Sequence, residues 1–91
     1  MSEDIIDYVS SENPDAVMFK DPDFLSAIIG YTLNENGLPV LVYDYDKMVE
    51  SLAAEYIDSD DAMTDATEWI EYNTMRTLPY IPNDGRPVIV Y

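Results

Sequence analysis

The sequence predicts a single α+β domain over residues 1–91, with a small antiparallel or mixed β-sheet of three to four strands and two main helices packed on one face. Three observations lead to this prediction. A length of 91 residues fits one domain with one modest core. Apolar residues make up 47% of the chain, which is too many for a disordered acidic tail. The apolar spacing is about two residues in the first half of the chain and three to four in the second half.

The N-terminal third begins with a segment of mixed character and continues into two predicted strands. Residues 1–13 fit either a short helix that starts at Ser2 or a frayed end. The short apolar run 16–19 is predicted to form a strand. In the stretch 24–33, alternate apolar residues are expected to share one face of a strand, namely Leu25, Ala27, Ile29, Tyr31 and Leu33. Gly30 inside this strand indicates a β-bulge or close packing.

A hairpin is predicted next, because Asn36-Gly37 is a dipeptide in which both residues tolerate the positive φ of a tight turn. The following strand spans 38–43. Pro39 cannot donate a ladder hydrogen bond, so that end of the strand is expected at an edge or outside the pairing. The apolar run 87–91 is expected to pair into the sheet as well, because an unpaired run of this kind would promote aggregation.

Two helices are predicted between these strands. The first buries Met48, Val49, Leu52 and Tyr56 at helical spacing, and Asp44 or Asp46 caps its first turn. The second begins at Thr64 or Asp65, runs through Asn73 and ends before Pro79. In this second helix we assign structural roles to Trp69 in the core, to Asn73 as a buried amide bonded to the 79–87 connection, and to Arg76 as a stacked or ion-paired cation.

The charge balance excludes several kinds of partner. Nineteen acids stand against four bases, Lys20, Lys47, Arg76 and Arg86, for a net charge of −15. Direct binding to nucleic acid needs a basic face that these four cannot form. The same charge argues against an anionic membrane surface, and no segment resembles a signal peptide or a membrane span. A cytoplasmic protein is therefore expected.

The residue types also argue against an enzyme. Without cysteine or histidine, thiolate zinc sites, cysteine nucleophiles and the commonest general base are all missing, and three scattered glycines make no phosphate-binding loop. The acidic loop that starts at Asp58 fails the calcium-loop pattern after Asp60, since Ala62 and Trp69 stand at the ligand positions five and twelve and Met63 stands at the glycine position six. We expect no catalytic residue, no metal and no cofactor.

The acids are concentrated in one part of the chain. Between positions 44 and 71 there are ten acids and one base, Lys47, for a net charge of −9. If the two helices pack through their apolar sides, these acids form a negative face that attracts a basic partner, or else a solvated surface without a specific partner. The predicted partner-binding residues are Asp44, Asp46, Glu50, Glu55, Asp58, Asp60, Asp61, Asp65, Glu68 and Glu71.

Residues 63–80, with the run Trp-Ile-Glu-Tyr-Asn-Thr at 69–74 and the later Arg76 and Leu-Pro-Tyr at 78–80, resemble a group of small acidic uncharacterised proteins. Segments 24–29, 45–50 and 87–91 share the resemblance. Phages and mobile elements of Gram-positive bacteria encode that group. The resemblance implies an origin and no residue-level activity. Acidic phage proteins of this size often inhibit host defence or nucleic-acid machinery, as anti-CRISPR and DNA-mimic proteins do.

Together these features predict a non-enzymatic acidic phage or mobile-element protein that binds and inhibits a basic, nucleic-acid-binding host protein in the bacterial cytoplasm. The alternative is a phage accessory protein that associates with itself or a partner through a Tyr-rich apolar surface. The chain has eight tyrosines, and its edge strand 88–91 would pair two copies as a homodimer.

Overall fold

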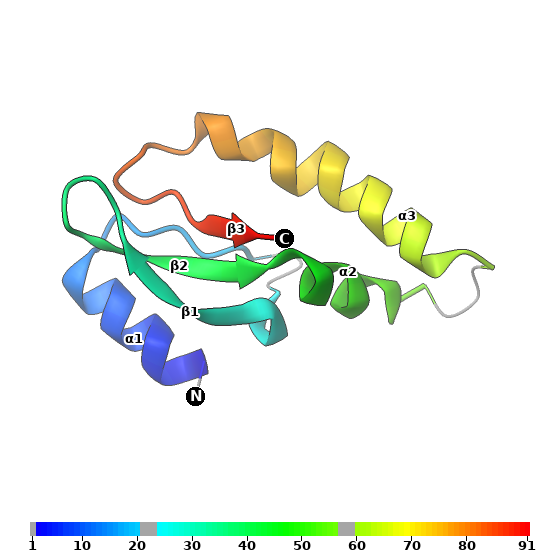
Figure 1. Cartoon of the computed structure of the whole chain (residues 1–91), viewed down its shortest axis with the longest axis horizontal. Coiled ribbons are helices and arrows are strands. Elements are labelled where there is room, and N and C mark those ends of the chain that lie inside the picture. Colours follow the sequence, from blue (N-terminus) through cyan, green and yellow to red (C-terminus); the bar gives the residue numbers. More distant parts are fainter. Residues whose placement is uncertain (1, 21–23, 57–59) are drawn as a thin grey trace.

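A three-stranded mixed sheet lies at the centre of the computed structural model, which describes residues 2–20, 24–56 and 60–91. The strands are β1 (Ile28–Leu33), β2 (Pro39–Asp44) and β3 (Val88–Val90), in the order β1-β2-β3. β1 runs antiparallel to β2, and β3 runs parallel to it (Figure 1). With its helices this sheet gives the predicted α+β fold.

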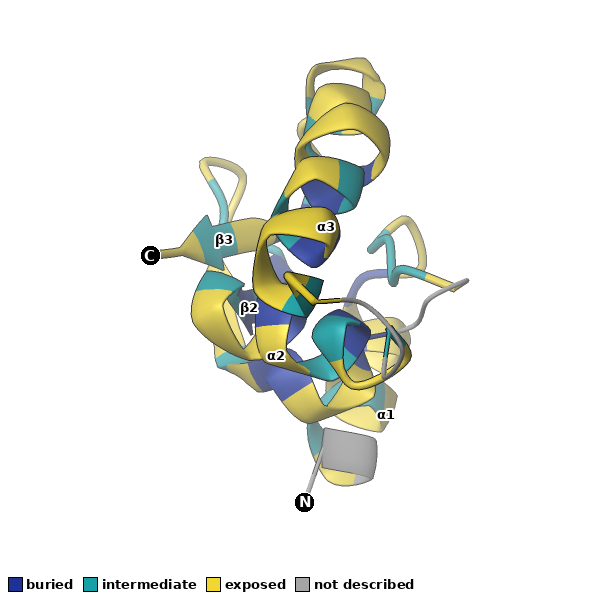
Figure 2. Cartoon of the chain, turned by 90° about the vertical axis from the view of Figure 1, so that its right-hand side faces the viewer, coloured by how far each residue is buried: buried dark blue, intermediate teal, exposed yellow. Residues whose placement is uncertain are grey.

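The helices cover one face of the sheet. Figure 2 shows α1 (Ser2–Glu12) and α3 (Ala62–Trp69) on the same side, and α2 (Tyr45–Ala53) packs against α3. Of the two alternatives for segment 1–13, the structure shows the helix, over residues 2–12. Leu41 and Tyr43 of β2 belong to the core between the two layers. The alternation along a strand therefore turns Val42 of β2, with Val88 and Val90 of β3, toward the face that the helices leave open.

The strand predicted over 24–33 is shorter than expected. Phe24 is buried in a left-handed conformation with φ of 51°, and a 3-10 turn (Leu25–Ala27) follows before β1 starts at Ile28. The register then shifts between Ile28 and Gly30, which confirms the bulge that Gly30 indicated. The prediction that five alternating apolar residues share one strand face is wrong, because burial of Phe24 turns the chain and the bulge changes the alternation.

The hairpin forms where predicted. Asn34 organises the turn, because its Oδ1 accepts from the backbone N–H of Asn36 (2.9 Å) and Leu38 (3.1 Å). Gly37 has a positive φ of 78°, whereas Asn36 does not, so only the glycine uses the left-handed region that was expected of both. β3 pairs with residues 42–44 of β2, so at Pro39 the central strand β2 pairs with β1 alone.

The run 16–19 forms no strand. Its backbone donors find partners outside any ladder: Val17 N–H donates to the carbonyl of Gly85 (2.9 Å), and Phe19 N–H donates to the Tyr43 hydroxyl (3.2 Å). Because a side-chain oxygen and a loop carbonyl satisfy these groups, the segment stays irregular while its apolar side chains pack against the core.

The C-terminal run pairs with the sheet, as predicted, in the register Val42↔Val88 and Asp44↔Val90. The connection before it is fixed by Asn13, which is 1% exposed. The Nδ2 of Asn13 donates to the carbonyls of Pro39 (3.0 Å) and Asp84 (2.7 Å). The end of α1 is thereby tied both to β2 and to the segment that leads into β3.

The helical segments follow the predictions only in part. Asp44 caps α2, because its Oδ1 accepts from Lys47 N–H (3.1 Å). α3 starts at Ala62, earlier than Thr64 or Asp65, and continues as a π-helical segment (Ile70–Thr74) and a 3-10 segment (Met75–Tyr80). Pro79 lies inside this last segment rather than beyond the helix, since the tighter 3-10 pattern accommodates it.

The assignment of Asn73 to a buried position is wrong. Its side chain is exposed, and its Nδ2 donates to the carbonyl of Trp69 (2.9 Å), one turn earlier in the same helix. The helix continues beyond Trp69 with π-helical rather than α-helical winding, so the α-helical spacing used for the prediction no longer applies. The connection 79–87 is held by Arg86, whose guanidinium donates to the carbonyls of Ile81 and Pro79.

The two asparagines give a matched pair of substitutions. Asn13→Ala removes both donors from the Pro39 and Asp84 carbonyls, and we expect the free energy of unfolding to fall by about 2–3 kcal/mol. Asn73→Ala removes one exposed bond within a helix and should change it by about 0.5 kcal/mol or less. Urea denaturation of both variants measures the difference. Equal losses would show that Asn13 does not hold the connection.

Candidate functional site

The candidate site is the set of exposed acids on α2, α3 and the segments that border them, which we call the acidic helix pair. The structure places eight of the ten predicted residues at exposed positions. These are Asp46, Glu50, Glu55, Asp60, Asp61, Asp65, Glu68 and Glu71. α2 and α3 contact each other, so the acids are carried by two adjoining helices.

The remaining two predicted residues differ. Asp44 is half-buried at the end of β2 and is engaged as the N-cap of α2, which makes it a structural residue. Asp58 lies outside the described residues. The predicted surface is therefore carried by the acids that follow Asp44 in the chain.

The buried residues of α3 define which side of this helix faces solvent. Ala66 and Ile70 are fully buried against the core. Asp61, Asp65 and Glu68 follow one another at spacings of four and three residues, so they form a stripe on the side of the helix that faces away from Ala66 and Ile70. Lysine is absent from this stripe.

One end of the acidic helix pair contains an aromatic pair. The rings of Tyr45 and Tyr91 have their centroids 4.9 Å apart with an interplanar angle of 36°. The Tyr45 hydroxyl donates to Oε2 of Glu71 at 2.8 Å. Burial, this hydrogen bond and the charges of Glu71, Tyr91 and Asp46 raise the pKa of Tyr45 to about 12. The first residue of α2 thus joins the end of β3 to the π-helical segment.

A second pair of tyrosines lies on another part of the molecule. Tyr8 of α1 and Tyr31 of β1 have ring centroids 5.0 Å apart. The charge of the neighbouring Tyr31, followed by partial burial, the charge of Glu12 and the side-chain hydrogen bond between Tyr8 and Tyr31, raises the pKa of Tyr8. Tyr72 and Tyr80 are strongly exposed. The exposed tyrosines therefore come from several elements of the fold.

The three residues expected to be structural have different environments. Trp69 is half-buried and packs against the core, whereas Asn73 and Arg76 are exposed. The residues that tie the chain together are Asn13 and Arg86, which the sequence analysis did not single out. Asn13 directly precedes Pro14 and follows the end of α1, and this position was the one available signal.

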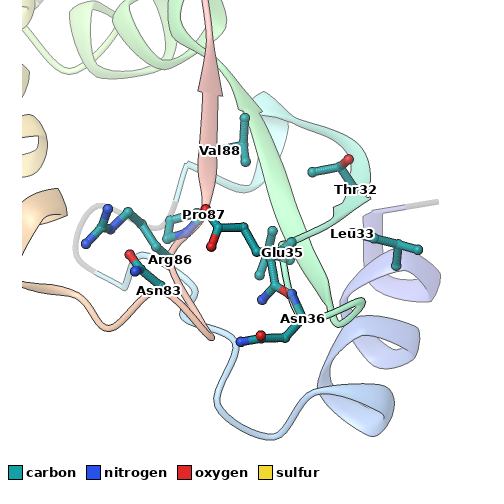
Figure 3. Close-up of a pocket in the computed structure, with 10 residues that line it drawn as sticks. Thr32, Leu33, Glu35, Asn36, Asn83, Arg86, Pro87 and Val88 are labelled. Atoms are coloured by element: carbon teal, nitrogen blue, oxygen red, sulfur yellow. The ribbon is translucent and has the colours of Figure 1, made fainter.

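A pocket of about 380 Å³ lies at the hairpin end of the sheet, away from the acidic helix pair. Figure 3 shows that side chains of the hairpin and of the connection into β3 line it, with Arg86 directed away from the hairpin side chains. Val40, Pro87 and Val88 supply its apolar part, and Glu35 brings a carboxylate. Since Arg86 is bonded to backbone carbonyls, its charge serves to hold the connection.

Within residues 2–20, 24–56 and 60–91, no group of three or more acidic side chains is arranged to hold a metal ion. In the same ranges, no helix has the length and apolar character that crossing a membrane requires.

The raised pKa of Tyr45 predicts a pH dependence of stability. Because folding raises this pKa above the ordinary value of 10, the contribution is fully present below pH 10 and is lost as the pH rises toward about 12. Over this interval, the free energy of unfolding should therefore fall less for Tyr45→Phe than for the parent protein. The difference should be about 1 kcal/mol or less, because the group is partly exposed. Urea denaturation at pH 9 and pH 11 measures it. The exposed Tyr72→Phe control should behave as the parent does, and identical pH dependence of Tyr45→Phe and the parent would contradict the prediction.

The geometry thus consists of exposed carboxylates on two helices and one aromatic pair at their edge. Comparison of the chain with protein-family models, curated proteins and solved structures finds no match. Its function is therefore inferred from the geometry of its own residues.

Proposed function

We propose that this chain is a non-enzymatic, acidic protein of a phage or mobile element that acts in the cytoplasm of the bacterial host. In this proposal it binds a basic, nucleic-acid-binding host protein and inhibits it, as DNA-mimic and anti-CRISPR proteins do. The observation that carries the proposal is the exposure of eight acids on α2, α3 and their borders.

The spacing of these acids suits a surface made to contact phosphate-binding residues. α3 has eight residues and is about 12 Å long, and its outer stripe places carboxylates at intervals of one helical turn. Double-stranded DNA presents one phosphate charge per roughly 1.7 Å of its axis, so a basic groove built for DNA holds several cations over the same length. Carboxylates on helices anchored by buried residues can occupy such a groove without a large ordering cost.

The absence of compensating bases supports a role in binding. Exposed helix faces commonly alternate acids with lysines, and each such i,i+4 pair contributes about 0.2–0.5 kcal/mol. Between positions 44 and 71 the chain has only Lys47 for ten acids. The repulsion that results opposes folding, and a basic partner would relieve it.

Neutralising part of the acidic helix pair tests the proposal. The variant Glu50→Gln, Glu55→Gln, Asp60→Asn and Glu68→Gln removes four charges from exposed positions that cap no helix. In capture from host lysate, we expect the parent protein to recover a basic DNA-binding protein at low salt and to release it at high salt. The variant should bind that protein at least about tenfold more weakly, and only the parent should displace duplex DNA from it.

The matched control removes four exposed acids elsewhere, by Asp4→Asn, Asp7→Asn, Glu12→Gln and Glu35→Gln. Both variants carry the same net charge, so a loss confined to the first locates the binding surface on the acidic helix pair. Equal recovery of the partner at low and high salt would exclude an electrostatic mimic. Equal losses in the two variants would exclude a localised surface.

The open face of the sheet favours a second candidate function, self-association or partner binding by an accessory protein. Ile29, Val88 and Val90 are 46%, 39% and 37% exposed, and β3 is a terminal strand of the sheet without a charged residue. Uncharged edge strands pair readily with other strands. This function predicts a dimer mass in light scattering that rises with concentration and is abolished by Val90→Lys. A constant monomer mass at all concentrations rules out the homodimer.

A further inference from the structure

The tyrosine pair at the edge of the acidic helix pair has the properties of a cation-binding site. Tyr91 is 81% exposed, whereas Tyr45 is half-buried. The ring of Tyr45 therefore packs against the ring of Tyr91, and most of the Tyr91 ring remains open to solvent. The face of a tyrosine ring attracts cations through its quadrupole. This site differs from the rest of the acidic helix pair, because it depends on two aromatic rings brought together by the fold.

A carboxylate is held beside these rings in a defined position. Glu71 accepts the Tyr45 hydroxyl hydrogen bond through Oε2 (2.8 Å), and this bond does not use Oε1. Asp46, in the first turn of α2, is close enough that its charge contributes to the raised pKa of Tyr45. The rings therefore lie in a negative field with one carboxylate already oriented by a hydrogen bond.

We propose that the open ring of Tyr91 and the carboxylate of Glu71 form an anchor for one arginine side chain of the basic partner. The guanidinium stacks on the exposed ring of Tyr91 and donates to Glu71, with Asp46 adding negative charge. This inference rests on the proposed function and specifies one contact within it.

Arginine fits this site better than lysine does. Its guanidinium is planar, so it stacks on a ring while its edge donates hydrogen bonds to a carboxylate. A lysine ammonium is a compact charge with a stronger hydration shell and cannot use both contacts in the same way. Carboxylates alone also favour arginine through bidentate hydrogen bonds, so the part of the preference that depends on the ring of Tyr91 identifies the anchor.

Two peptide probes of equal charge test the anchor on the whole chain. We expect nona-arginine to bind the parent protein about two- to fivefold more tightly than nona-lysine in calorimetric titrations, which is the gain that one exposed cation–π contact provides. Tyr91→Ala and Glu71→Gln should each lower this preference by weakening nona-arginine binding. Glu71→Gln keeps an acceptor for the Tyr45 hydroxyl, and Tyr91 is mostly exposed, so both variants should fold.

Matched controls separate the anchor from general electrostatics. Tyr80→Ala removes another exposed tyrosine, and Glu68→Gln removes a neighbouring charge. Both should keep the preference for nona-arginine, and Glu68→Gln should weaken the two peptides equally. In NMR spectra of the parent protein, nona-arginine should shift the ring resonances of Tyr45 and Tyr91 more than nona-lysine does.

The outcomes distinguish the anchor from the function on which it rests. Equal affinity of the parent protein for the two peptides, or a preference that Tyr91→Ala leaves undiminished, overturns the anchor and leaves the basic-partner proposal standing. If neither peptide binds at low salt, the acidic helix pair does not attract cations and both proposals fail.

Discussion

The backbone of Asp84 and Gly85 is the point on which the arrangement of the sheet depends. The Asn13 and Asn34 amides both donate to the Asp84 carbonyl, which joins the end of α1 and the hairpin to the connection before β3. A Cβ on Gly85 would overlap the carbonyl of Asp15, so only glycine permits this close approach. Because β3 starts three residues after Gly85, its parallel register beside β2 follows from this junction.

Charge is the second constraint on the fold. A net charge of −15 on 91 residues opposes compaction, and the core that offsets it is small, with Phe24, Tyr43, Met48 and Ile70 among its largest fully buried side chains. The acids of α2 and α3 are exposed, where water and salt weaken their mutual repulsion. The same exposure leaves them accessible to a cationic partner. Such a partner would stabilise the folded state by mass action in addition to relieving repulsion.

Local patterns predicted the elements that local interactions determine. The capped helix α2 and the Asn-Gly hairpin depend on residues close in sequence, and the apolar run 87–91 predicted a paired strand but not its parallel orientation beside β2. The left-handed turn at Phe24 and the exposure of Asn73 depend instead on what packs around them. The sequence analysis chose Asn73 as the buried amide and missed Asn13, because α-helical spacing was extended through a segment with π-helical winding.

The candidate site likewise combines features that local sequence determines with features that depend on the tertiary fold. The positions of the acids could be read along the chain, since they follow from where the two helices bury their apolar sides. The contact between Tyr45 and Tyr91 could not be predicted in this way, because the two residues are 46 positions apart in the sequence and only the pairing of β2 with β3 brings them together. In the parallel register Asp44 lies beside Val90, so the residues that directly follow the two strands, Tyr45 and Tyr91, also come together. The aromatic pair is thus a direct product of the parallel pairing, and a β3 strand in antiparallel orientation would place Tyr91 at the opposite end of the sheet, far from Glu71 and the acidic helix pair.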